Sequence, residues 1–475
     1  MTDLTATRQA GVSTLSVDTY RAIWRWHFYA GLIAVPFMIL LAVTGSLYLF
    51  RDEIDRTAFA SRTIVAEATT PQQVPSALIA TAQTAFPAAR VEAYRPPVGP
   101  TASARVTLDT DAGTAYVFLN PYSGAILATM LKTQEFNEVV RKLHSLEYFG
   151  TYANRVIEAM AGFAIILVVS GLYLWWPRRQ TGGVLSVRGT PSRRVFWRDT
   201  HAVTGAIAGG FIAFLALSGL PWSSFWGGKL TELTVATGTG YPAALWDNVP
   251  TSGEHAQHAM QTVGWTMEAS PMPMSQHSMG DGTMGDSAMG DGMMGDAAKA
   301  APLGIDRIVE IARERGMAPG FEVTLPSDAT GVFTTAVYPD DLSQVRTIHI
   351  DQYSGKPLVD IGYADYGPVA KVTEFGINVH MGQEFGLPNQ LLMLATCLAI
   401  ILSSVAAVVM WLKRRPAGRL GVPPYPTSRR VYGALWGMAL VFGVLFPLSG
   451  LLIVAMIALD VLVIRRVPVL KRTFA

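Results

Sequence analysis

Two histidines stand in long apolar runs and are followed by small residues at matched distances. His27 and His201 each have a glycine four residues later, then a hydroxyl residue and a second glycine at seventeen and eighteen residues. These residues are Gly31 and Thr44-Gly45 in the first run, and Gly205 and Ser218-Gly219 in the second. Because an ionisable side chain within a membrane segment is costly and usually functional, a histidine that recurs in this pattern is a candidate ligand.

A second pair of histidines is also followed by matching residues at equal distances. His144 and His380 are each followed by Phe-Gly at five and six residues, by tryptophan at thirty-one and by arginine at thirty-four. The matched residues are Phe149, Gly150, Trp175 and Arg178 in one copy, and Phe385, Gly386, Trp411 and Arg414 in the other. This agreement predicts an internal two-fold repeat in which each half consists of a membrane span, an exported domain and a second membrane span. Both halves then enter from the same side, and a pseudo-twofold axis along the membrane normal is expected.

Imidazoles at equal depth in the two halves could share one haem iron. Seventeen helical residues span about 25 Å, so His27 and His201 are expected near the cytoplasmic face, and His144 and His380 near the outer face. Across a helix bundle, each like-depth pair would hold one haem, which makes two bis-histidine haems. The aromatic and small residues expected around them are Trp24, Trp26, Phe28 and Gly31 at the inner level, and Phe149, Gly150, Phe385 and Gly386 at the outer level.

The alternative interpretation is structural. Interfacial histidines often serve as hydrogen-bonded anchors, and their aromatic neighbours can form a membrane-interface belt. His144 makes the greater demand on geometry, because the thirty-one residues to Trp175 would form about 46 Å of straight helix. The chain should therefore bend near Gly150 or Asn154. His349 falls on an expected strand and is expected to be an ordinary sheet residue.

Composition and charge place the chain in a membrane. Half of its 475 residues are hydrophobic and only 15% are charged, which is typical of a polytopic α-helical membrane protein with folded extramembrane parts. Basic clusters end the apolar runs, so both termini and the loops at 179–196 and 413–429 are expected in the cytoplasm. Segments 51–141 and 227–378 then lie outside. The first run is too long for a signal-peptide core and is interpreted as a retained anchor.

Each exported segment is expected to form a small α+β domain of one helix on a three-stranded antiparallel sheet. Both end in a Tyr-Ser-Gly turn, at 122–124 and 353–355. The first comprises a helix at Pro75–Phe86 and strands at Arg90–Arg95, Ala104–Asp109 and Ala115–Asn120. The second comprises a helix at Ile305–Arg315 and strands at Phe321–Leu325, Phe333–Tyr338 and Arg346–Asp351.

The last apolar run, 431–464, is interrupted by Pro447 and is predicted to form a helical hairpin. Six crossings are preferred, with five as the alternative. The predicted boundaries are a cytoplasmic tail at 1–22, spans at 23–50, 142–178, 197–226 and 379–412, exported domains at 51–141 and 227–378, cytoplasmic loops at 179–196 and 413–429, and the hairpin at 430–465.

A methionine-rich insert at 251–299 interrupts the second exported domain. Met279, Met284 and Met289 are each followed by Gly-Asp at a five-residue period, and such a composition predicts a flexible loop. Thioethers are soft ligands that favour Cu(I), so copper capture is one interpretation and a plain linker is the other. The candidate ligands are Met279, Met284, Met289, Met294, His255, His258 and His277. The single cysteine, Cys397, lies in an apolar run and is expected to be buried.

The chain resembles the PepSY-associated transmembrane family, which includes siderophore-iron reductases of bacterial inner membranes. The resemblance rests on Trp26-His27, on the two Tyr-Ser-Gly turns, on His144 and His380 with their Phe-Gly followers, and on the Leu-Trp-Trp-Pro-Arg-Arg sequence at 174–179. It implies two haem b groups, a periplasmic reducing site and a role in iron uptake. The insert at 251–299 departs from the family pattern and leaves the identity of the metal open.

Two hypotheses follow. The first is a dihaem reductase in the inner membrane that reduces a periplasmic ferric siderophore or Cu(II), with His27, His201, His144 and His380 as axial ligands. Its partners would be the lipid bilayer, a quinol or cytoplasmic electron donor and the metal chelate, with no nucleic acid. The second is a non-redox protein whose PepSY-like domains bind peptide or metal and deliver it to a partner. No dinucleotide-binding fingerprint is present in a strand-to-helix context.

Overall fold

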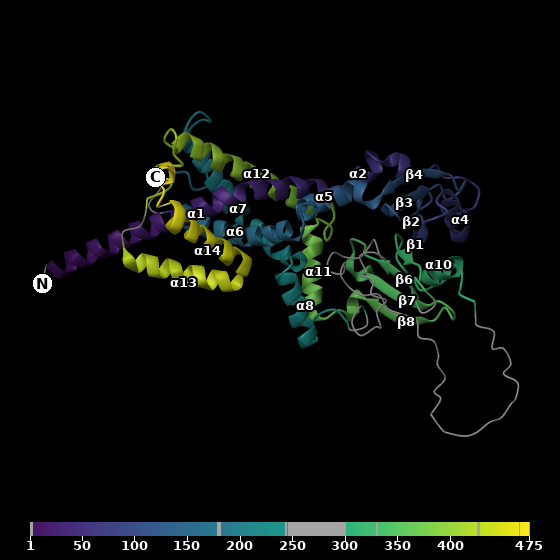
Figure 1. Ribbon diagram of the computed structural model, residues 1–475. Helices are drawn as coiled ribbons and strands as arrows, with labels where there is room; N and C mark the ends of the chain where they lie inside the picture. The colour runs from purple at the N-terminus through teal and green to yellow at the C-terminus, as the bar shows by residue number, and fades with distance from the viewer. Residues whose placement is uncertain are drawn as a thin grey trace, which may run out of the picture. The chain divides into compact units, whose positions relative to one another are not determined.

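The computed structural model describes residues 3–177, 182–242, 245, 301–328, 331–424, 428–464 and 466–474 (Figure 1). The chain divides into two compact units. The helical unit consists of Met1–Phe50, Val140–Leu230 and Val379–Ala475, and the sheet unit consists of Arg51–Val139 and Thr231–Asn378. The methionine-rich insert lies outside the described residues.

The helical unit is built on four long helices. They are α1 (Asp3–Leu49), α6 (Thr151–Trp175), α7 (Arg194–Ser218) and α12 (Leu387–Arg414). Each packs against two of the others, in the cyclic order α1, α6, α7, α12 and back to α1. Helices α1 and α7 are therefore diagonal in this bundle. Because α1 begins at Asp3, residues 3–22, which were predicted as part of a cytoplasmic tail, continue the helix of the first span.

The described chain has five helices that are long and apolar enough to cross a membrane. Four are those of the bundle, and the fifth is Pro447–Ile464. It contains α14 (Pro447–Leu459) and a π-helical turn (Asp460–Ile464). Helix α13 (Arg429–Leu445) holds only a shorter apolar stretch, Leu435–Leu445.

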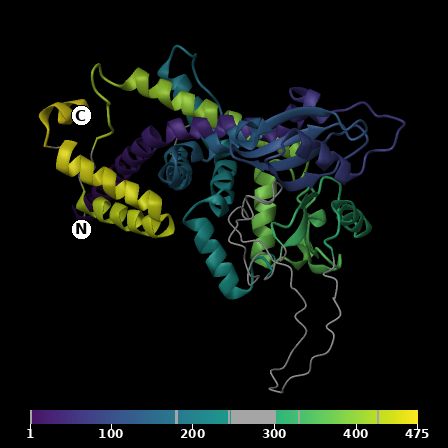
Figure 2. The same cartoon turned by 45° about the vertical axis from the view of Figure 1, so that its right-hand side comes forward.

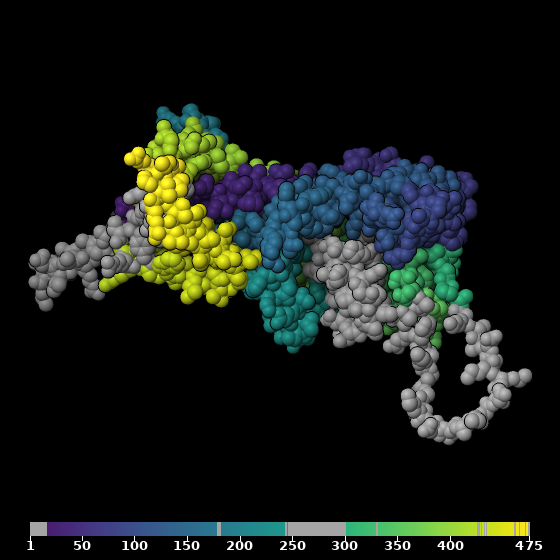
Figure 3. Space-filling model, viewed as in Figure 1, coloured from purple at the N-terminus to yellow at the C-terminus, as the bar shows by residue number. Residues whose placement is uncertain are grey.

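The chain reverses at Phe446-Pro447, so that α13 and α14 lie side by side (Figure 2). Their close approach depends on small residues, since a Cβ added at Gly443 would lie 3.4 Å from the Cα atom of Gly450. Helix α14 also packs on α6, where the buried Ser449 hydroxyl donates to the carbonyl oxygen of Ala159. In the space-filling view the yellow C-terminal helices lie against the purple first helix (Figure 3), in agreement with the contact between α13 and α1.

The sheet unit contains one eight-stranded antiparallel sheet in the order β4-β3-β2-β1-β5-β6-β7-β8 (Figure 1). Its strands are β1 (Arg90–Arg95), β2 (Ala104–Thr110), β3 (Gly113–Leu119), β4 (Ile126–Leu131), β5 (Glu322–Thr324), β6 (Val332–Val337), β7 (Arg346–Asp351) and β8 (Pro357–Gly362). The sequence predicted the six strands other than β4 and β8, but two separate three-stranded sheets were the wrong arrangement. Each half has a fourth strand after its Tyr-Ser-Gly turn, and β1 pairs with β5 to join the halves.

One face of the sheet carries a continuous apolar core covered by α4 (Pro75–Ala85) and α10 (Ile305–Glu314). In α10 the buried residues Ile305, Ile308, Val309 and Ala312 follow the helical period, which directs one stripe of the helix at the sheet. Leu78 of α4 belongs to the same cluster. The two halves therefore share a single core, and neither buries its apolar face alone.

The opposite face is polar at the junction of the halves. The Arg105 guanidinium on β2 donates to the Glu322 carboxylate on β5 at 2.7 Å, and the Glu322 side chain is only 2% exposed. The Arg105 guanidinium also lies over the Tyr116 ring, 4.8 Å from its centre. This ion pair links strands from different halves across β1.

Replacing Arg105 with alanine should remove the guanidinium that donates to the buried Glu322 carboxylate, at a cost of about 3–5 kcal/mol in the free energy of unfolding. Thermal unfolding of the purified full chain, followed by circular dichroism, measures the loss. The matched control is Arg307→Ala, since Arg307 forms ion pairs with Glu310 and Glu314 at the surface, where such pairs contribute about 1 kcal/mol or less. Equal losses in the two variants would contradict a special role for the buried pair.

His349 lies in the polar face of the sheet, as expected of an ordinary strand residue. It is 1% exposed, and its Nδ1 atom lies 2.9 Å from the Thr334 hydroxyl on the neighbouring strand. Burial lowers the pKa of His349 from its ordinary value of 6.5 to about 4. The folded chain therefore binds this proton more weakly than the unfolded chain.

It follows that acid should destabilise the sheet unit through His349. As the pH falls from about 6.5 towards 4, the free energy of unfolding should drop by up to about 3 kcal/mol, because the unfolded chain takes up the proton first. A His349→Leu variant should show a smaller fall in unfolding temperature between pH 7 and pH 5 than the unaltered chain. Parallel pH profiles for the two proteins would refute this assignment.

Candidate functional site

The first histidine pair, His27 and His201, lies inside the helical bundle. His27 comes from α1 and His201 from α7, and these diagonal helices direct the two rings at each other. The ring centres are 6.1 Å apart and the planes are inclined at 71°. The sequence repeat placed these histidines at one level, and the structure brings them together.

The second histidine pair, His144 and His380, occupies equivalent corners of the chain. His144 is the last residue of α5 (Phe136–His144), and His380 is the last residue of α11 (Pro368–His380). Each is followed by a short turn that leads into a long helix of the bundle. His144 is close enough to His380 for the two side chains to interact electrostatically.

Residues in left-handed backbone conformations make these turns. Leu146 and Gly150 have φ of 58° and 87° before α6, and Gly382 and Gly386 have φ of 77° and 58° before α12. The bend expected near Gly150 or Asn154 is confirmed. Asparagines in the first turns of α6 and α12 brace both bends, through Asn154 to the carbonyl oxygen of Ser145 and Asn389 to that of Val379.

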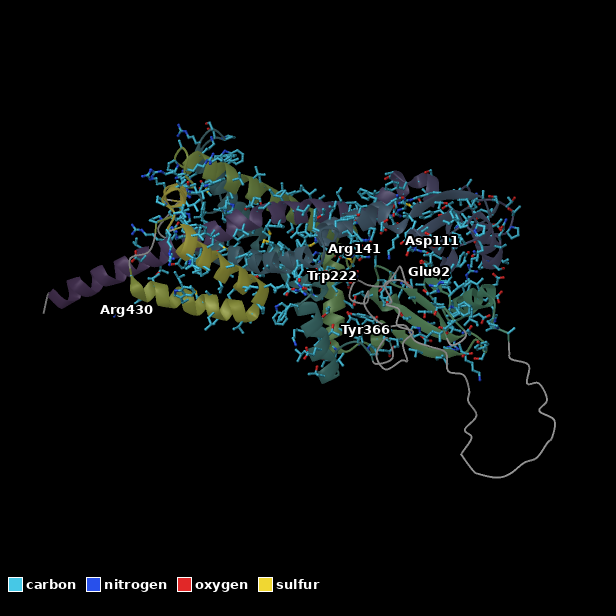
Figure 4. The ribbon with its side chains drawn as sticks, viewed as in Figure 1. Glu92, Asp111, Arg141, Trp222, Tyr366 and Arg430 are labelled. Atoms are coloured by element: carbon cyan, nitrogen blue, oxygen red, sulfur yellow. The ribbon has the colours of Figure 1, made fainter. Side chains whose placement is uncertain are left out.

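An ion pair further fixes the turn after His144. The Arg141 guanidinium (Figure 4) is bidentate to the Glu147 carboxylate at 2.9 and 3.1 Å, and the Ser145 hydroxyl donates to the same carboxylate. Arg141 is 5% exposed, whereas the Glu147 side chain is 34% exposed, so only the arginine side of the pair is removed from solvent. His144 therefore stands in a rigid corner.

The small residues of the repeat serve the second histidine pair. The hydroxyl oxygens of Thr44 and Ser218 each lie 2.8 Å from the Nδ1 atom of one ring, His144 and His380 respectively. The glycines next to these hydroxyl residues also face the rings, at distances where a Cβ atom would make ordinary van der Waals contact. A Cβ atom would lie 3.6 Å from His144 at position 45 and 3.8 Å from His380 at position 219.

The first pair is held in the same manner by serines that the repeat did not identify. The Nδ1 atom of His27 lies 2.8 Å from the Ser170 hydroxyl on α6. The Nδ1 atom of His201 lies 2.9 Å from both the carbonyl oxygen and the hydroxyl oxygen of Ser403 on α12. Ser170 stands 26 residues after His144, and Ser403 stands 23 residues after His380, so no common offset relates the two serines.

These contacts favour one position of the ring hydrogen. Three of the four hydroxyls lie within hydrogen-bond distance of the carbonyl oxygen four residues earlier in their own helix, and donation to that carbonyl leaves them as acceptors for the imidazole. The fourth ring, His201, faces a carbonyl oxygen, which has no hydrogen to donate. The arrangement therefore favours hydrogen on Nδ1 and an unprotonated Nε2 in all four rings. Within the described residues, no hydrogen bond to these Nε2 atoms is present.

The spacing of the first pair suits two ligands on opposite sides of one metal ion. A metal–imidazole bond of about 2 Å, plus about 1 Å from the nitrogen to the ring centre, places two opposed ring centres roughly 6 Å apart. The 6.1 Å between His27 and His201 matches this distance. In the described part of the chain, no group of three or more His, Cys, Asp or Glu side chains could hold a metal ion. The methionines and histidines proposed from the insert lie outside it.

The surroundings differ in part from those expected. The rings of Phe149 and Phe385 are 69% and 61% exposed, so in this structure neither forms a packed wall at the second pair. Reasoning from the sequence missed Trp222, whose ring centre lies 5.5 Å from that of His380 (Figure 4). Trp222 follows Ser218 by one helical turn, a position that no general rule marks as functional.

Near the first pair, the expected aromatic residues have other partners. The guanidinium of Arg414 lies over the rings of Trp24 and Phe28, at 4.9 and 5.4 Å. Gly31 brings α1 close to α6, since a Cβ atom there would lie 3.7 Å from Leu167. Cys397 is buried, as expected, in a cluster with Ala42 and Ile400.

With this geometry established, the comparison with known families can be considered. Residues 24–414 match the model of the PepSY-associated TM region. The chain belongs to the PepSY-associated transmembrane family. The resemblance inferred from its motifs is thereby confirmed, and the match includes all four histidines. A search of curated proteins finds no match to this chain.

In this PepSY-associated protein, Gly171 should be required beside His27. A Cβ atom at position 171 would lie 3.2 Å from the Cε1 atom of that ring, so Gly171→Val should displace the imidazole and cost about 1–3 kcal/mol in stability. Gly210→Val is the control, because no atom lies within 4 Å of a Cβ atom there. Both changes place valine in a membrane helix, so their difference in unfolding temperature isolates the contact with His27.

Proposed function

We propose that this PepSY-associated membrane protein is a dihaem b electron-transfer protein that reduces a metal chelate on the outer side of a bacterial inner membrane. The observation that carries the proposal is the common state of the four histidines. Each has its Nδ1 atom within hydrogen-bond distance of an oxygen, which favours a free Nε2 lone pair, and the ring centres of one pair already have the separation that a shared metal requires. A structural anchor has no need for the same tautomer at four positions.

The residues have separate roles in this proposal. His27 and His201 would hold one haem, and His144 and His380 the other. Bound haem supplies iron that accepts and gives up single electrons. The hydroxyls and the carbonyl on Nδ1 keep each ring in the ligating tautomer and fix its direction. Glycines beside the rings leave space, and the apolar helices exclude water.

The internal repeat and the orientation are part of the proposal. Their support is an order of elements that both halves contain: a long helix, a helix that packs on the sheet and is followed by four antiparallel strands, a short helix that ends in histidine, and a second long helix. The basic clusters at the ends of the apolar runs support cytoplasmic termini. The two halves of the sheet would then be PepSY-like domains in the periplasm.

The chemistry of the proposed reaction suggests a ferric siderophore as substrate. Addition of one electron converts Fe(III) to Fe(II), which hard siderophore oxygens bind less strongly, so the metal is released. A quinol or a cytoplasmic reductase would supply the electron. Reduction of Cu(II) is the second candidate, and the methionines of the insert favour it because thioethers bind Cu(I).

The alternative function is delivery of peptide or metal without redox chemistry. The two hypotheses differ in a property that is visible on purification. Under the reductase hypothesis the protein should carry two haems per chain and show a Soret band that shifts on addition of dithionite. A colourless preparation from haem-replete cells would reject the reductase and favour the delivery protein.

Alanine variants should assign the ligands. His27→Ala and His201→Ala should each lower the haem content from two to about one per chain by removing the same haem, and His144→Ala and His380→Ala should each remove the other. The measurement is the pyridine haemochrome content per chain, with His349→Leu as a control that retains both haems. Loss of haem in none of the four variants would refute the ligand assignment.

A further inference from the structure

Each imidazole receives its hydrogen-bond acceptor from the other long helix of its own half. His27 on α1 uses Ser170 on α6, and His201 on α7 uses Ser403 on α12. The histidines that precede α6 and α12 use Thr44 on α1 and Ser218 on α7. In all four contacts the acceptor lies on the other long helix of the same half, but the chemical nature of the acceptor differs.

Three acceptors are hydroxyl oxygens that belong to a short chain of hydrogen bonds. Ser170, Thr44 and Ser218 each accept from an imidazole and donate to the carbonyl oxygen one turn earlier. Donation to that carbonyl polarises the hydroxyl and makes its oxygen a better acceptor. Removal of the hydroxyl takes away the oxygen that lies 2.8 Å from the ring nitrogen.

The fourth acceptor is of a different kind. His201 has the main-chain carbonyl of Ser403 at 2.9 Å as well as the Ser403 hydroxyl at the same distance. A carbonyl oxygen has two lone pairs and can serve both its helix and the imidazole. Substitution of the Ser403 side chain therefore leaves an acceptor in place, whereas the same substitution at Ser170 does not.

We propose that Ser170, Thr44 and Ser218 are positioning residues that set the reduction potentials of the two metal centres, and that the main-chain carbonyl of Ser403 takes this role for His201. The inference rests on the proposed function. Donation of the Nδ1 hydrogen to an oxygen increases the electron density on Nε2, which favours the oxidised metal and lowers its potential. Loss of the acceptor should raise the potential.

The serine pair gives a matched test. Ser170→Ala should raise the reduction potential of one of the two haems, while Ser403→Ala, the same chemical change at the equivalent contact, should leave both potentials unchanged. Thr44→Val and Ser218→Ala should each raise the potential of the other haem. The measurement is a spectroelectrochemical titration of the purified full-length protein, with the haems assigned through the histidine variants.

The outcomes are distinct. Equal shifts for Ser170→Ala and Ser403→Ala would overturn the role of the carbonyl, and unchanged potentials in all variants would overturn the proposal as a whole. If Ser170→Ala loses its haem, Ser170→Thr must retain the haem at the unaltered potential, because the hydroxyl is preserved; failure to do so also overturns the proposal. A preparation without haem rejects the reductase itself, whereas two haems with unchanged potentials reject only this inference.

Discussion

The helical bundle depends on a simple requirement: an imidazole among apolar side chains must donate its ring N–H hydrogen to an acceptor. An unmet donor in such a place costs about 1–3 kcal/mol. The chain meets the requirement four times, and each acceptor lies on the other long helix of the same half. The Ser170 and Ser403 contacts link α6 to α1 and α12 to α7. The Thr44 and Ser218 contacts link α1 to the end of α5 and α7 to the end of α11.

The turns before α6 and α12 serve to bring histidine rings into the bundle. Histidines within α1 and α7 reach the centre of the bundle directly. Those before α6 and α12 reach it because the chain turns sharply between a short helix and a long one, at residues that adopt positive φ. A straight helix would have carried His144 away from Thr44. The flexible backbone of Gly150 and Gly386 is therefore part of the site, although neither residue contacts a ring.

Much of this arrangement could be predicted from the sequence. The pairing of His27 with His201 followed from matched offsets, and the bend at Gly150 from the length of a straight helix. Ser170 and Ser403 were not predictable, because a serine in an apolar helix commonly bonds to its own backbone and its partner lies on another helix. Strands β4 and β8 were missed because edge strands are half exposed and lack a clear alternation of polar and apolar residues.

Local sequence patterns also could not predict that the two halves form one sheet. Strand β5 is only three residues long, and it pairs with a strand more than two hundred residues earlier. That pairing restricts how the protein can be divided. A fragment that stopped before β5 would expose β1 as an open edge together with half of the apolar core. Unpaired edges of this kind recruit other strands, so isolated halves are expected to self-associate or aggregate. Biochemical work on the sheet unit must therefore keep both halves within one polypeptide or supply them together.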